Sequence, residues 1–161
     1  MRFLFAAVAA LALSACSAGV DEHSSTDSGE RQMSREQFEG YLKALQAHDY
    51  AGFASYYTDD FRAHIYMPPA PSDGPLDRAG AQEMERTLAE HWNWTMDVHQ
   101  VVFTQDGIAV RATMRGPLLK PWPDSPLDGP KAGDEFVGGF ASFYRLRGDK
   151  IAELWVVANQ W

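Results

Sequence analysis

Two residues with side chains able to transfer protons stand out, and both lie on segments with the composition of β-strands. His64 lies within residues 61–67 (FRAHIYM), and Glu153 lies within the last such segment. A histidine of ordinary basicity titrates near neutral pH and can act as base or acid. Burial of Glu153 would favour its protonated form. Each residue also has a structural interpretation: His64 as a hydrogen-bonded residue at a pocket mouth, and Glu153 in a salt bridge with Arg111.

Aromatic and polar side chains near this pair could surround a ligand. In residues 151–160, strand alternation puts Glu153, Trp155 and Asn159 on one face and smaller apolar residues on the other. An apolar surface with a few polar groups is typical of a ligand cavity, so we expect the Trp155 face to line one. Several of these residues could equally be ordinary core, and His99 could face either the cavity or solvent. The candidate substrate-binding residues are Tyr66, Trp92, His99, Arg111, Phe136, Trp155 and Asn159.

Other kinds of chemistry have little support in the sequence. The five histidines show no metal-ligand spacing, and no carboxylate cluster accompanies them. There is no phosphate-binding glycine loop, nucleophile elbow or dinucleotide fingerprint, so neither a metal nor a cofactor is expected. The net charge of −8 disfavours nucleic acid as a partner, because phosphate binding requires a basic surface. The expected partner is a small hydrophobic ligand or substrate.

The N-terminal residues have the features of a bacterial lipoprotein signal. Arg2 precedes an apolar run over residues 3–13, which is too short to span a bilayer but suits a signal peptide. Residues 13–16 (LSAC) resemble a lipobox, and Cys16 is the only cysteine, so lipidation of its thiol is the expected use. We therefore predict a signal peptide at 1–15 and a lipid anchor on Cys16, placing the protein in a bacterial cell envelope. In a Gram-negative host, Ser17 after the cysteine favours the periplasmic side of the outer membrane.

A polar, serine-rich tether is predicted from the lipidated cysteine to the folded part, over residues 16–33. As a flexible chain it would have an end-to-end distance of about 20–25 Å. The folded domain is predicted over residues 34–161. Its first helix is indicated by a capping box at residues 34–37 and an apolar stripe at helical spacing: Phe38, Tyr41, Leu42 and Leu45. Further helices are predicted over residues 51–57 and 78–92, the latter with Ala81, Met84, Leu88 and Trp92 on one face.

The remaining elements are strands and two proline-rich loops. Strands are predicted at 61–67, 97–105 and 108–116, followed by a hairpin over 135–161 that turns at residues 147–150. Asp106-Gly107 is a strong hairpin signal. Loops are predicted at 67–75 and at 117–134, where five of the nine prolines lie. Helices that precede an antiparallel meander indicate an α+β domain, with the helices across one face of a curved sheet.

The order and spacing of five segments resemble the SnoaL-like polyketide cyclase family, within the nuclear transport factor 2-like superfamily. The segments are residues 45–50 (LQAHDY), 57–61 (YTDDF), 74–80 (GPLDRAG), 110–116 (VRATMRG) and 148–155 (GDKIAELW). The resemblance implies a cone-shaped fold, with three N-terminal helices packed on a curved, mostly antiparallel sheet. It also implies an apolar pocket between helices and sheet, and a homodimer through the outer face of the sheet.

The resemblance further implies acid–base chemistry for an intramolecular aldol closure. The family's aspartate near the end of the last strand corresponds here to Asn159, and its histidine corresponds to Leu118. An amide cannot accept a proton near neutral pH. Two hypotheses remain open. The first is an envelope-anchored cyclase, isomerase or hydratase that acts without a cofactor on a small hydrophobic carbonyl compound, with His64 or Glu153 as base. The second is a non-catalytic lipoprotein that binds hydrophobic ligands, or a dimeric interaction module.

Overall fold

The computed structural model describes residues 32–67, 70–71, 74–121 and 131–160, with the backbone alone described at 67, 70, 71, 159 and 160. The predicted signal peptide, Cys16 and all but the end of the predicted tether lie outside the described residues. Within them, no helix is both long and apolar enough to cross a membrane.

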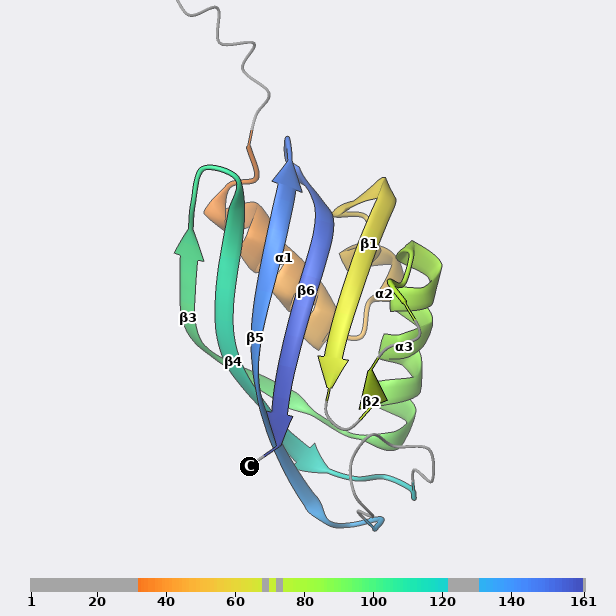
Figure 1. The fold of residues 1–161 in the computed structure, drawn as a ribbon. Coiled ribbons are helices and arrows are strands. Elements are labelled where there is room, and N and C mark those ends of the chain that lie inside the picture. The colour runs from red at the N-terminus through yellow and green to blue at the C-terminus, as the bar shows by residue number, and fades with distance from the viewer. Residues whose placement is uncertain (1–31, 68–69, 72–73, 122–130, 161) are drawn as a thin grey trace, which may run out of the picture.

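Three helices and six strands follow one another along the described chain (Figure 1). The helices are α1 (Arg35–Gln46), α2 (Tyr50–Ala54) and α3 (Arg78–His91). The strands are β1 (Tyr57–Met67), β2 (Ala70–Pro71), β3 (Thr95–Phe103), β4 (Gly107–Pro117), β5 (Glu135–Arg147) and β6 (Lys150–Gln160). They form one sheet in the order β2-β1-β6-β5-β4-β3.

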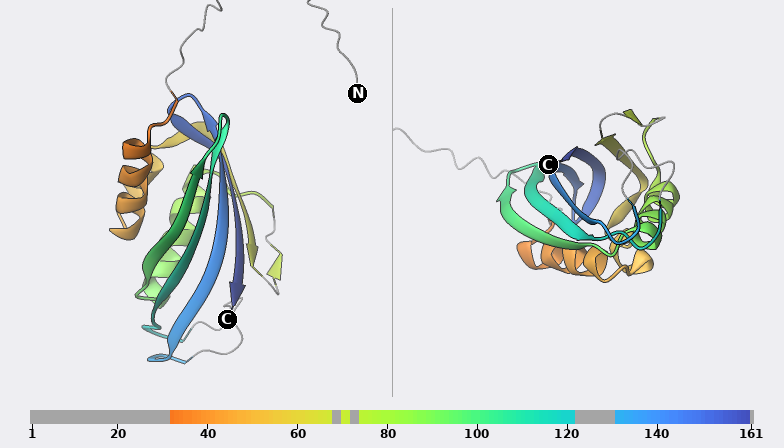
Figure 2. Two further views of the ribbon diagram at one scale, coloured as in Figure 1. Left: turned by 90° about the vertical axis from the view of Figure 1, so that its left-hand side faces the viewer. Right: turned by 90° about the horizontal axis from the view of Figure 1, so that it is seen from below.

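The predicted meander is confirmed, since β3, β4, β5 and β6 pair consecutively and antiparallel. On the other side of β6, β1 pairs with it in parallel, and β2 pairs with β1 at the edge of the sheet. The helices lie against one face of the strongly curved sheet, as Figure 2 shows from the side and from below. This confirms the mixed α+β class and agrees with a nuclear transport factor 2-like fold.

The second helix is shorter than predicted and the first strand is longer, because strand pairing begins early. The second helix was predicted to continue to Tyr57, but α2 ends at Ala54 and β1 already begins at Tyr57. Tyr57 is in register with Ile151 of β6, and the Ile151 amide donates to the carbonyl of Tyr56 at 2.8 Å. These non-local hydrogen bonds outweigh the weak helical preference of a short segment. The predicted loop after β1 also contains the two-residue strand β2.

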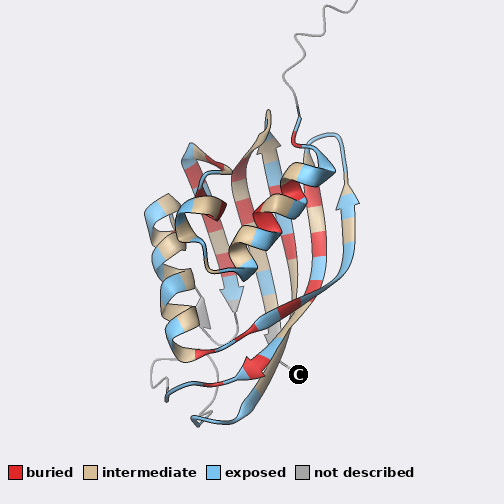
Figure 3. Cartoon of the chain, turned by 180° about the vertical axis from the view of Figure 1, so that it is seen from behind, coloured by how far each residue is buried: buried red, intermediate tan, exposed pale blue. Residues whose placement is uncertain are grey.

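Local sequence signals explain where the longer helices begin. The capping box of α1 is present: the Ser34 hydroxyl accepts from the Gln37 amide at 3.1 Å, and Gln37 Oε1 accepts from the Ser34 amide at 2.8 Å. The carboxylate of Asp77 caps α3 by accepting from the Gly80 amide at 2.8 Å. Buried side chains lie along the inner side of α1 and across the facing strands, coloured red in Figure 3.

The approach of β4 to the segment before β3 requires a glycine. Gly116 has a φ of +152°, and a Cβ atom there would lie 2.0 Å from the carbonyl oxygen of Asn93. No other residue permits such contact without displacing the backbone. A side-chain hydrogen bond joins the same two segments, because Trp92 Nε1 donates to the Gly116 carbonyl at 2.8 Å. Trp92 is thereby fixed at one end of the space between helices and sheet.

Candidate active-site cavity

A cavity of about 430 Å³ lies between α1, α3 and the face of the sheet that the helices cover. Most of its wall is apolar. Helix α1 contributes Tyr41, Leu42 and Leu45, and α3 contributes the longest helical stretch, from Gly80 to Leu88. The sheet contributes alternate residues of its strands, among them Ala63, Ile65, Val110, Met114, Phe136, Phe140, Leu154, Val156 and Ala158.

Glu85 is the chemically exceptional residue of this wall. It lies on α3, and its Oε2 atom is inaccessible to solvent and has no hydrogen-bond partner. The residue as a whole is half-buried, and its side chain forms part of the cavity wall. Desolvation in these apolar surroundings raises the pKa of Glu85 to about 7. A carboxyl group in this state can exchange a proton near neutral pH, as a general acid or base must.

Three tyrosines and a serine place hydroxyl groups in the same cavity. The Tyr41 and Tyr57 hydroxyls are 3.3 Å apart, so one donates to the other. Tyr144 and the fully buried Ser142 lie on β5 and also line the cavity. Burial raises the pKa of all three phenols, and the negative charge of Glu85 adds to the shift in each case. For Tyr144 the pKa reaches about 12, held down in part by contacts with Tyr41 and Ser142. All three phenols therefore remain protonated donors at physiological pH.

Sequence reasoning missed Glu85, although a signal for it exists. The apolar stripe predicted on the third helix consists of Ala81, Met84, Leu88 and Trp92. Glu85 lies four residues after Ala81 and three before Leu88, which puts it in the middle of that stripe. A carboxylate on the buried side of an amphipathic helix is an exception to binary patterning, and such exceptions concentrate at functional sites.

Two of the predicted substrate-binding residues lie in the cavity wall. Trp92 is buried, and its ring meets that of Phe136 edge-on with the centroids 4.9 Å apart. Both line the cavity. Trp94 also lines it, and its indole Nε1 is buried without a hydrogen-bond partner. Aromatic side chains therefore line the cavity at these positions, and their contact with a substrate stays a prediction.

The predicted orientation of β6 is reversed in the structure. Leu154, Val156 and Ala158 face the cavity, whereas Glu153 and Trp155 lie on the outer face of the sheet. The same holds for β1, where Ala63 and Ile65 line the cavity and His64 does not. Alternation defines two faces but not which one the helices cover, and here they cover the face with the smaller apolar side chains.

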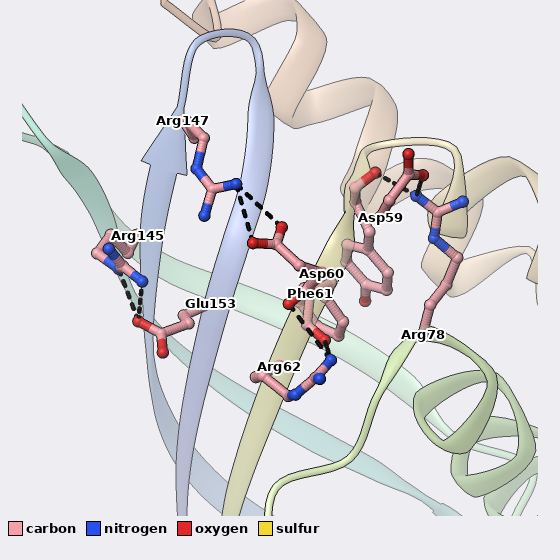
Figure 4. A network of polar contacts seen from close by, with 9 residues as sticks. Asp59, Asp60, Phe61, Arg62, Arg78, Arg145, Arg147 and Glu153 are labelled. Atoms are coloured by element: carbon pink, nitrogen blue, oxygen red, sulfur yellow. Dashed lines mark hydrogen bonds and ion pairs between the residues drawn. The ribbon is translucent and has the colours of Figure 1, made fainter.

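On the outer face, the two predicted acid–base candidates belong to one surface cluster. The rings of His64 and Trp155 stack in parallel with centroids 5.3 Å apart. His64 Nε2 lies 3.9 Å from Glu153 Oε1. Figure 4 shows the other partner of this carboxylate: Arg145 Nε donates to Glu153 Oε2 at 2.6 Å. The expected salt-bridge partner Arg111 is thus replaced by Arg145, which lies opposite Glu153 in the β5–β6 register. The structure assigns neither candidate to the cavity.

The other predicted ligand-binding residues do not reach the cavity where they are described. Tyr66, His99 and Arg111 are exposed, and His99 Nε2 is hydrogen-bonded to the Thr113 hydroxyl at 2.8 Å. The side chain of Asn159 lies outside the described residues, although its backbone pairs with Gly139. Leu118 is buried and forms an isolated bridge with Trp92, but it is not part of the cavity wall. Within the described residues, no group of three or more potential metal ligands lies together.

The sequence pattern of the SnoaL-like domain family matches residues 38–154, which is well over half of the chain. The chain belongs to the SnoaL-like domain family. The match extends from α1 into β6 and includes the residues that line the cavity, except Val156 and Ala158. No curated protein sequence matches the chain.

Solved structures support the fold of this SnoaL-like domain. IdmH, a proposed polyketide cyclase from Streptomyces antibioticus, is 22% identical with a TM-score of 0.64, over 77% of this chain and 90% of that one. A SnoaL-like polyketide cyclase from Agrobacterium tumefaciens is 16% identical with a TM-score of 0.60, over 76% and 87% of the two chains. AclR, a proposed hydroxylase from Streptomyces galilaeus, is 14% identical with a TM-score of 0.63, over 76% of each chain. At such identities the fold is shared, and the reaction must be argued from the site.

Proposed function

We propose that this SnoaL-like domain catalyses a cofactor-free acid–base reaction, of the cyclase or isomerase type, on a small hydrophobic carbonyl compound. The observation that carries the proposal is Glu85, an unpaired carboxyl group with a pKa of about 7 in an apolar cavity that also presents phenol groups. Two of the solved structures with this fold are described as polyketide cyclases, which supports the same reaction class.

The arrangement suits removal of a proton from carbon next to a carbonyl group. Glu85 in its ionised form would take the proton, and the negative charge would develop on the carbonyl oxygen. The phenols of Tyr41, Tyr57 and Tyr144 lie in a site of low polarity, where hydrogen bonds to a developing oxyanion are strongest. One hydroxyl of the Tyr41–Tyr57 pair donates to the other, and the hydroxyl that accepts keeps its own proton for such a bond. In an isomerisation the protonated Glu85 would return the proton at a second carbon. In a ring closure the enolate carbon would form a bond to a second carbonyl carbon of the same molecule, and the proton of Glu85 would pass to that carbonyl's oxygen.

The decisive experiment compares Glu85→Gln with a matched control, Glu90→Gln. Glu90 is an exposed residue of the same helix, paired with Lys120 at 3.2 Å and absent from the cavity wall. Exchange of α-protons for deuterium in a panel of small apolar ketones, followed by NMR, reports proton abstraction without knowledge of the natural substrate. We expect Glu85→Gln to slow exchange by about 10²–10⁴-fold, the usual contribution of a positioned base, and Glu90→Gln to leave it unchanged.

The pH dependence adds a second criterion. Because Glu85 must be ionised to act as base, the exchange rate of the unmodified protein should rise with pH through about 7. Exchange that survives Glu85→Gln with the same pH profile would contradict the role of Glu85. A catalytic role for His64 or Glu153 finds no support in their placement outside the cavity.

Two further proposals concern a lipid anchor, which rests on the sequence, and a homodimer, which rests on exposed apolar side chains. We propose that Cys16 carries a lipid that anchors the domain in a bacterial envelope; the lipobox-like residues 13–16 support this. We also propose a homodimer through the outer face of the sheet. Phe143 and Val157 on that face are about half exposed, at 50% and 49%, and lie on the adjacent strands β5 and β6. Sedimentation of the purified domain would show whether this surface pairs.

A further inference from the structure

The cavity carries negative charge without a positive counterpart in its wall. Among the described residues that line it, Glu83 and Glu85 are acidic, and none is a lysine, arginine or histidine. Glu83 is exposed and forms an ion pair with Arg86, which is not part of the wall. The carboxylate of Glu85 is left without any such partner.

This unpaired group determines which ligand charge the cavity favours. An ionised carboxylate that is withheld from water is costly unless a cation or hydrogen-bond donor pairs with it. Glu85 Oε2 has neither in the described structure. A carboxylate or phosphate ligand would add a like charge, whereas an ammonium group would supply the missing partner through a charge-assisted hydrogen bond.

The remainder of the wall also matches an ammonium ion with an apolar body. Aromatic rings attract cations to their faces, and Tyr41, Tyr57, Tyr144 and Trp94 all contribute to this wall. The phenol oxygens can accept hydrogen bonds, and an ammonium group has N–H donors but no acceptor. The apolar residues on the sheet would contact the hydrophobic part of the ligand.

We propose that the cavity binds lipophilic primary and secondary amines in their ammonium form, with Glu85 as counter-ion. This binding activity goes beyond the proposed reaction on a neutral carbonyl compound, although it uses the same carboxylate. It requires no turnover, so it can be tested independently of catalysis.

The binding should depend on pH in a defined direction. The titratable groups of the wall that face Glu85 are Tyr41 on α1, Tyr57 on β1 and Tyr144 on β5, with Glu83 on α3 itself. The phenols have pKa values raised above their usual range and stay neutral near pH 7. Glu85 becomes neutral below about pH 7, so the amine loses its counter-ion as the solution is acidified.

The test uses three probes of nearly equal shape: naphthylmethylamine as the cation, naphthalenemethanol as the neutral analogue and naphthoate as the anion. Titration calorimetry measures their affinities for the purified protein at about pH 8 and about pH 5.5. At the higher pH we expect the amine to bind at least about tenfold more tightly than the alcohol, and the acid to bind most weakly. At the lower pH the advantage of the amine should largely disappear.

Two variants show whether Glu85 is responsible. Glu85→Gln should bind amine and alcohol equally well, while retaining the alcohol affinity of the unmodified protein as evidence of an intact cavity. Glu90→Gln removes the same charge from the outside of α3 and should keep the preference for the amine. Equal or weaker binding of the amine at about pH 8, a preference that survives Glu85→Gln, or binding of none of the probes would each overturn the proposal. Failure of ketone exchange together with a clear amine preference would refute only the proposed reaction.

Discussion

At the scale of single residues, the site is defined by a carboxyl group whose buried oxygen has no hydrogen-bond partner in the fold. Glu85 faces an apolar cavity, whereas Asp60 and Glu153 outside the cavity are each paired with an arginine, as with Asp60 and Arg147 at 3.0 Å. Pairing keeps a carboxylate ionised and structural, while desolvation without a partner raises its pKa toward neutrality. The neighbouring phenols intensify this contrast, because they remain neutral and provide hydrogen bonds rather than positive charge.

A cost in stability should accompany this carboxyl group. Burial raises the pKa of Glu85 from an ordinary 4.5 to about 7. The folded protein then binds more protons than the unfolded chain between these values, so the free energy of unfolding falls as pH rises from about 4.5 to about 7. The loss is complete above pH 7 and amounts to about 3 kcal/mol.

Glu85→Gln should therefore stabilise the protein at pH 8 and have little effect at pH 4.5. Urea denaturation of both proteins over this pH range measures the difference, with Glu90→Gln as the control for loss of an exposed charge. A variant that is destabilised at every pH would indicate that Glu85 is an ordinary structural residue.

At the scale of elements, a polar clamp fixes the helix that carries Glu85. Arg78 is the first residue of α3, and its Nη2 donates to the Tyr57 carbonyl at 2.7 Å and to Asp59 Oδ1 at 3.1 Å (Figure 4). Leu76 and Ala63 also exchange two backbone hydrogen bonds of 2.8 Å just before the helix. The register between α3 and β1, and hence between Glu85 and the Tyr57 phenol, depends on these contacts.

Arg78→Met should destabilise the domain by about 1–3 kcal/mol and slow ketone proton exchange. The main loss is the hydrogen bond to the partly buried carbonyl, which leaves an unpaired acceptor. The contact with Asp59 contributes little, because that carboxylate is fully exposed. Arg86→Met on the same helix, whose ion pair with Glu83 is at the surface, serves as control in denaturation and exchange assays.

A simple outcome would contradict the clamp. If Arg78→Met and Asp59→Ala lowered stability equally, the surface ion pair rather than the carbonyl contact would hold α3. Because Arg78→Met already removes both contacts, adding Asp59→Ala to it should cause no further loss of stability.

At the scale of the whole molecule, the two faces of the sheet differ in character. The covered face encloses the cavity, while the outer face combines exposed apolar side chains with the cluster of His64, Trp155 and Glu153. A reaction inside the cavity and an association through the outer face would therefore not compete for the same surface.

The anchor proposed at Cys16 is tested in a bacterial expression host. Cys16→Ala should remove metabolic labelling with a radioactive fatty acid and move the protein from the detergent phase to the aqueous phase on Triton X-114 partition. Ser17→Ala leaves the thiol in place and should retain the label. A protein that takes up no label with Cys16 intact would contradict the lipoprotein assignment.

The sequence by itself determined the longer elements and their order. The capping box of α1, the Asp-Gly turn between β3 and β4, and the alternation on β5 and β6 are local signals, and each predicted its element. The family resemblance indicated the class of fold. Trp92 and Phe136 line the cavity as expected. A large aromatic residue next to a pocket faces inward whether it serves as core or as lining.

Only the tertiary structure decided which side of the sheet is inside. A strand has two alternating faces, and on β6 the composition of either face suits burial. The face with Glu153 is predicted to line the cavity but lies outside it, and the same is true of His64 on β1. The helical pattern places Glu85 within an apolar stripe, but its raised pKa follows only from the docking of α3. The desolvation comes from a cavity whose wall includes segments distant in sequence, such as those of Tyr41 and Tyr144. Periodicity is a property of neighbours along the chain, whereas the polarity of a cavity is produced by all the elements that enclose it.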